Sequence, residues 1–172
     1  MNHNSKYFRN INCIEDLKSQ YKKLAFTFHP DIVKDESLKD SALEEMKIIN
    51  AEYSELFKVY KNIYKNAEGE VYETSHPTNE IPQDFINIIQ EVIHMHGVKI
   101  ELCGRWLWCT GNTKEYKDDF KKMGFFWSSK KLAWYYHNPM DKSYSKERYS
   151  LDEIRARYGS HIYENELVPE LS

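Results

Sequence analysis

The 172 residues include 24 lysines and arginines and 27 aspartates and glutamates, so the net charge is -3 and gives no overall signature of nucleic-acid binding. No apolar run approaches the ~20 residues of a membrane span and residues 1–6 carry no apolar signal region, so we expect a cytoplasmic protein without membrane contact. Cys13, Cys103 and Cys109 are odd in number and lack a framework spacing, which argues against a set of disulfides.

The first strong periodicity runs from Ile14 to Phe28, where apolar residues recur at the three-and-four spacing of one helix face. The opposite face carries a set of lysines, namely Lys18, Lys22 and Lys23. Pro30 lacks a backbone N–H and restricts the residue before it, so the helix is predicted to end near His29. A second periodic segment starts near Ser41 and fades near Tyr64. The two segments predict antiparallel helices joined by a loop.

This region resembles the J-domain of DnaJ-type co-chaperones. Tyr7-Phe8 matches the aromatic pair of the family's short first helix, and Tyr21–Ala25 matches its second-helix core. His29-Pro30-Asp31 matches the tripeptide that follows, and Ile49–Tyr53 matches the Ile, Asn and Tyr of its third helix. A His-Pro-Asp alone is a weak signal, but its place between these two helices makes it specific.

The resemblance implies a binding face for a DnaK-type chaperone, made of His29, Pro30 and Asp31 with Lys18, Tyr21, Lys22 and Lys23 beside them. Exposed lysines on one rigid helix would steer an acidic partner surface. The alternative interpretation is a merely solvated lysine face and a turn histidine. Ile32 and Val33 depart from the family, whose members usually have a basic and a polar residue there. The family's usual fourth helix, Gly/Phe-rich linker and Cys-x-x-Cys repeats are also missing, so the second half is expected to differ.

The expected fold class is α+β, with a helical hairpin in residues 1–64, an acidic polar linker in 65–80 and a small αββαββ unit with a short C-terminal helix in 81–172. Within the last part, the patterns predict a helix from Pro82 to His96 and a hairpin of Val98–Cys103 with Trp106–Thr110. A helix near residues 116–123, a second hairpin of 125–127 with 132–136, and a helix from Leu151 to Tyr158 are predicted to follow.

The second half is modestly basic and aromatic, with eleven Lys and Arg and six Asp and Glu between Val98 and Tyr149. Its Trp106-x-Trp108-x-x-Gly111 pattern and the Gly, Trp and Tyr residues that follow look like a module of J-domain proteins from phages and integrative elements of Gram-positive bacteria. A two-residue turn at Gly104-Arg105 would place Trp106 and Trp108 on the face opposite Ile100 and Leu102.

Two interpretations of this aromatic set follow from that register. The favoured one is that the C-terminal helix, or the one from Pro82, covers the rings as core. The other is a surface for unpaired bases or an extended protein segment. Its candidate residues are Arg105, Trp106, Trp108, Lys130, Lys131 and Trp134.

The chain carries no nucleotide-binding fingerprint or catalytic Ser-His-Asp order, so we do not expect an enzyme. His94, His96, Cys103 and Cys109 lack the spacing of a zinc site, and no metal or other cofactor is expected. The first functional hypothesis is a DnaJ-like co-chaperone with an unknown client protein. The second is a nucleic-acid-binding or anti-defence protein of a mobile element, with single-stranded nucleic acid as its partner, and the third is a self-associating adaptor.

Overall fold

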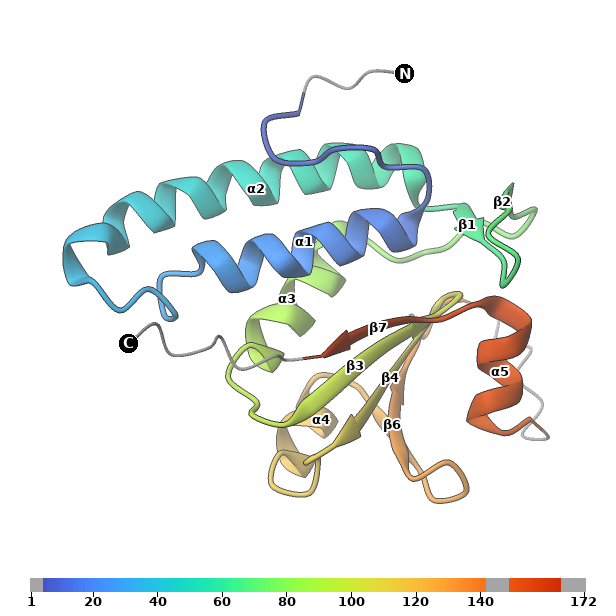
Figure 1. Cartoon of the computed structure of the whole chain (residues 1–172). Helices are drawn as coiled ribbons and strands as arrows, with labels where there is room; N and C mark the ends of the chain where they lie inside the picture. The colour runs from blue at the N-terminus through green and yellow to red at the C-terminus, as the bar shows by residue number, and fades with distance from the viewer. Residues whose placement is uncertain (1–4, 142–148, 165–172) are drawn as a thin grey trace.

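The computed structural model describes residues 5–141 and 149–164, and the side chains up to Ser160. The chain forms an α+β fold in which a pair of long helices lies over a five-stranded sheet (Figure 1). The helical elements are α1 (Ile14–Phe28), η1 (Glu36–Leu38), α2 (Lys39–Tyr60), α3 (Pro82–Val92), α4 (Lys117–Lys122) and α5 (Leu151–Tyr158). The strands are β1 (Ile63–Lys65), β2 (Val71–Glu73), β3 (Val98–Cys103), β4 (Trp106–Gly111), β5 (Phe126–Ser128), β6 (Ala133–Tyr136) and β7 (His161–Glu164).

The helices α1 and α2 form the predicted antiparallel pair. Helix α1 has the predicted bounds and ends where Pro30 removes the next donor. The Tyr21 hydroxyl donates a hydrogen bond to Asn50 Oδ1 at 2.8 Å and so ties the two helices together. Helix α2 ends at Tyr60, four residues before the predicted end, because Ile63 already begins β1.

The segment predicted as a polar linker contains ordered structure. Strands β1 and β2 pair antiparallel, with Tyr64 opposite Tyr72, and the turn between them places Gly69 at a φ of +87°. Tyr64 is buried and joins the main core. The predicted linker therefore contributes β2 and the turn of a hairpin that the buried Tyr64, the residue just before it, anchors.

The five-stranded sheet has the order β5-β6-β4-β3-β7 with antiparallel pairs throughout. The predicted succession of helix, hairpin, helix and hairpin is confirmed, and α5 follows with its predicted bounds. Helix α3 stops at Val92, short of the predicted His96. Strand β7 was not predicted, and it completes the sheet by pairing with β3 after α5.

One apolar core runs through both halves of the chain. Tyr21 from α1, Tyr53 from α2 and Phe85 from α3 are fully buried with ring centroids 4.5 to 6.1 Å apart. The same cluster continues into Ile100 and Leu102 on the sheet. The predicted boundaries near residues 64 and 80 therefore do not separate two cores.

We expect Gly111→Ala to destabilise the protein far more than Gly69→Ala. Both glycines have nearly the same positive φ, +86° and +87°, so alanine is strained at either position by about 1–2 kcal/mol. A Cβ on Gly111 would lie 2.3 Å from the carbonyl oxygen of Gly97, whereas on Gly69 the nearest atom is a lysine methylene at 3.8 Å. Urea unfolding should show about 2 kcal/mol more loss for Gly111→Ala, and equal losses would contradict this packing.

Candidate functional site

The His-Pro-Asp tripeptide forms a defined turn at the end of α1. The carbonyl oxygen of His29 accepts hydrogen bonds from the backbone N–H groups of Ile32 and Val33, at 3.0 and 3.2 Å. The backbone N–H of Asp31 donates to Nδ1 of His29 at 3.2 Å, which orients the imidazole. The turn therefore presents Pro30 and Asp31 in a fixed conformation.

A second histidine, His94, reaches this turn from the segment after α3. Its ring lies edge-on to His29 with centroids 6.2 Å apart, and its Nε2 is 3.5 Å from Oδ2 of Asp31. Burial lowers the pKa of His29, an effect that Asp31 opposes and His94 reinforces. The imidazole of His29 is therefore neutral near pH 7, while the Asp31 side chain remains 61% exposed.

The lysine face predicted on α1 is largely covered. Lys18 is only 3% exposed, and its Nζ contacts both carboxylate oxygens of Glu80 at 2.7 and 2.9 Å. The same ammonium lies 4.9 Å from the centre of the Phe85 ring. The prediction of an exposed charge at Lys18 is wrong, because α3 and the residues before it pack on this side of α1.

The neighbouring positions of α1 differ in exposure. Tyr21 is fully buried and belongs to the core, so it is not a surface residue. Lys22 is 6% exposed, with its Nζ 5.0 Å from the centre of the Phe26 ring. Lys23 is exposed. Of the predicted basic set, Lys23 alone offers an open charge beside the turn.

The predicted register of the β3–β4 hairpin is confirmed, since Leu102 pairs with Leu107 and Glu101 with Trp108. Trp106 and Trp108 stack with centroids 6.0 Å apart on the face away from the main core. Leu151 and Ile154 of α5 pack against this second cluster, and Trp108 is 3% exposed. The favoured interpretation, that the C-terminal helix covers the rings, thus holds for Trp108, whereas Trp106 is half-buried.

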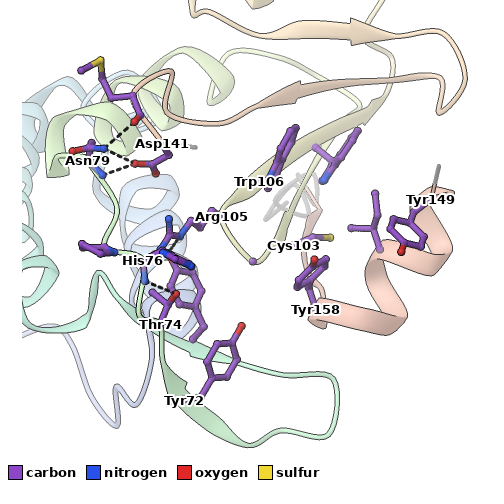
Figure 2. A pocket seen from close by; sticks show the side chains of 16 residues that line it. Tyr72, Thr74, His76, Asn79, Cys103, Arg105, Trp106, Asp141, Tyr149 and Tyr158 are labelled. Atoms are coloured by element: carbon purple, nitrogen blue, oxygen red, sulfur yellow. Dashed lines mark hydrogen bonds between the residues drawn. The ribbon is translucent and has the colours of Figure 1, made fainter. Parts of the chain in front are cut away.

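Arg105, Trp106 and Trp108 line one pocket of about 520 Å³, which Figure 2 shows from close by. The other predicted residues lie elsewhere. Trp134 is buried on the opposite face of the sheet, stacked on Phe120 at 5.4 Å, because adjacent strand residues point to opposite faces. Lys130 is exposed at the β5–β6 turn, and Lys131 has its Nζ 5.7 Å from the centre of the Trp108 ring.

Much of the pocket comes from residues that the sequence did not indicate. Tyr72 and His76 lie in the supposed linker, and Tyr149 and Tyr158 flank or end α5. Figure 2 shows these side chains and Arg105 around one hollow. No spacing in the sequence links these segments, because they meet only in the folded chain.

The His and Cys residues considered for a zinc site do not form one in the described part of the chain. Among the described residues, no three His, Cys, Asp or Glu side chains gather as a ligand set. Cys103 lies in the cluster under α5 and Cys109 in the main core, on opposite faces of the sheet. Cys13, Cys103 and Cys109 are free and buried.

Comparison with protein-family models, with curated proteins and with solved structures gave no match for this chain. Within the described residues, no helix has the length and apolar character that crossing a membrane requires.

We expect Glu80→Gln to lower the free energy of unfolding by about 3 kcal/mol, because it leaves the Lys18 ammonium buried without a carboxylate. The matched control is Glu55→Gln, which removes an exposed partner of Lys58 and should cost less than about 1 kcal/mol. Urea unfolding of both variants measures the difference. A Glu80→Gln loss no larger than that of the control would show that Lys18 is not held as described.

The three thiols should resist alkylation in the native protein. Burial raises the pKa of Cys13 and of Cys103 to about 12 and raises that of Cys109 as well, so almost no thiolate is present at neutral pH. Mass spectrometry after iodoacetamide treatment should find no modified cysteine in buffer and three in urea. Rapid native modification of Cys103 would mean that the cluster under α5 opens.

Proposed function

We propose that this protein is a DnaJ-like co-chaperone that binds a DnaK-type ATPase through the His29-Pro30-Asp31 turn and stimulates its ATP hydrolysis. The observation that carries the proposal is the placement of this tripeptide at the exposed end of an antiparallel helix pair whose Tyr21 and Asn50 are hydrogen-bonded. These are residues on which the resemblance to J-domains rests. The second half of the chain would then select the client protein.

The geometry of the turn suits a binding role. Its backbone hydrogen bonds to His29 fix the loop before any partner arrives, so binding loses little conformational entropy. The Asp31 carboxylate is largely exposed and available to a cationic group of the partner. The neutral His29 ring offers a flat surface beside it, with a side chain that is 15% exposed.

The covered lysines limit how the partner can approach. Because Lys18 is paired with Glu80 and Lys22 is buried, the turn and Lys23 are the reachable part of the predicted binding face. Electrostatic steering along the whole of α1 would require α3 and Glu80 to move away. We therefore propose that the first contact is made at the turn, where Ile32 and Val33 are half-buried and add apolar surface.

Adding the protein to a bacterial DnaK-type chaperone should raise its steady-state ATP hydrolysis, and His29→Gln should reduce the stimulation to near the basal rate. The imidazole accepts the Asp31 N–H, so its replacement removes both the ring and the orientation of the turn. The matched control is His96→Gln, since His96 is exposed and lies outside the turn.

Three results would contradict the proposal. They are an absence of stimulation by the wild type, equal stimulation by wild type and His29→Gln, and an equal loss in His96→Gln and His29→Gln. Circular dichroism of each variant ensures that a lost effect is not a lost fold.

A further inference from the structure

The pocket beside the β3–β4 turn has no role in the co-chaperone proposal. It lies between the β1–β2 hairpin with the segment that follows it on one side, and the β3–β4 turn with α5 on the other (Figure 2). Its volume of about 520 Å³ falls in the range of sites that hold a small ligand. From its rings and its unpaired donors we infer that this pocket binds a nucleotide, with the base against the aromatic wall and the phosphate at Arg105.

Exposed aromatic rings gather around this one opening. Tyr72, Tyr149 and Tyr158 come from separate segments, and each is between 42% and 45% exposed. Leaving large rings in water forgoes the free energy of burying them, and clustered exposed apolar surface is typical of binding sites. With the half-buried Trp106 they provide flat faces on which a base can stack, an interaction worth about 1–3 kcal/mol per base.

Arg105 supplies a cation with an unused donor. Its Nε donates to the Tyr64 hydroxyl at 3.1 Å, but its Nη2 is buried and has no hydrogen-bond partner. Burial raises the pKa of Tyr64, so the phenol stays neutral and does not cancel the guanidinium charge. The planar guanidinium matches the oxygens of a phosphate, and a small shift of the side chain would give Nη2 an acceptor.

The hydrogen-bonding balance of the lining favours a ligand rich in acceptors. Among the described residues, Arg105 Nη2 and Trp108 Nε1 are the buried side-chain N–H groups without a partner, and both residues line the pocket. The carboxylate of Asp141, which could have accepted from a ligand, already accepts from Thr78 and from Asn79, and Figure 2 shows the contact with Asn79. A phosphate supplies such acceptors through its oxygens, and a base supplies further ones through its ring nitrogens or carbonyl oxygens.

The same chemistry is offered by a free nucleotide and by one nucleotide of a single strand. The full-length protein is therefore titrated with AMP, with adenosine and with a dT oligonucleotide of about twelve residues, at low and at moderate salt. Binding is followed by the intrinsic tryptophan fluorescence of the protein, to which Trp106 and Trp108 contribute, and by calorimetry. We expect AMP to bind at least about tenfold more tightly than adenosine, because only AMP carries the phosphate for Arg105.

Two variants and one control assign the binding to the pocket. Arg105→Gln should weaken AMP binding at least about tenfold and remove the preference over adenosine, while Tyr158→Ala should weaken AMP and adenosine alike. Phe126→Ala removes a ring that is 54% exposed on β5, outside the pocket, and should change neither. The fold of each variant is checked by circular dichroism. If Arg105→Gln does not fold, the loss of binding in Tyr158→Ala still tests whether the ligand occupies this pocket.

The outcomes are distinct. If both AMP and the oligonucleotide bind, and Arg105→Gln and Tyr158→Ala weaken both, the pocket accepts nucleotides in general. If the oligonucleotide alone binds, and both variants lose that binding, the ligand is a nucleotide within a single strand. Equal affinity for adenosine and AMP would overturn the role of Arg105. No binding of any probe at low salt, or equal losses in Phe126→Ala, would overturn the inference as a whole. None of these results depends on stimulation of a DnaK-type chaperone.

Discussion

The contact among Tyr21, Tyr53 and Phe85 is the interaction on which the arrangement of the chain depends. Each ring comes from a different helix, and all three are fully buried. Phe85 fixes α3 beneath the α1–α2 pair, and the other buried face of α3 meets the sheet through the same core. Removing any one ring would leave a large cavity at the point where the helices and the sheet meet.

That contact also determines the electrostatics of α1. Once α3 lies against the helix, Lys18 cannot reach solvent, and a buried ammonium is tolerable only with a carboxylate beside it. Glu80, two residues before α3, supplies that carboxylate. In an isolated helix pair, Lys18 would be exposed and could attract an acidic partner; here its ion pair with Glu80 attaches the second half of the chain to α1. The His-Pro-Asp turn is left as the accessible part of this face.

The sequence was sufficient for elements whose signals are local. The bounds of α1 follow from its periodicity and from Pro30, and the β3–β4 register follows from the turn at Gly104-Arg105. It was insufficient wherever a distant segment decides the outcome. Periodicity shows which face of α1 is polar but not that later segments of the chain pack on it, so Lys18 and Lys22 were placed in solvent. The acidic stretch after Tyr64 resembles a linker because its pairing with β1, and the burial of Tyr64 that anchors this pair, depend on partners elsewhere in the chain.

Only part of the pocket could be predicted from the sequence, again because distant segments complete it. Arg105, Trp106 and Trp108 stand together in one hairpin, and their pattern indicated a face of its own. The tyrosines that close the pocket come from β2 and from around α5, where nothing periodic marks them. Trp134 was predicted as a site residue only because it is a tryptophan, whereas its position on β6 directs the side chain into the main core.

Strand β7 is the last described element of the chain, yet it pairs with β3 in the sheet and lies against α1 (Figure 1). During synthesis the α1–α2 pair is complete long before this strand emerges, because its contacts lie within the first sixty residues. The β3 edge, in contrast, has no neighbour on that side until residues 161–164 are available. Until then it is an unpaired strand edge of the kind that associates with other chains. The order of the elements along the chain therefore makes the pairing of β7 with β3 a late event in folding, and until it occurs the open edge of β3 can associate with other chains.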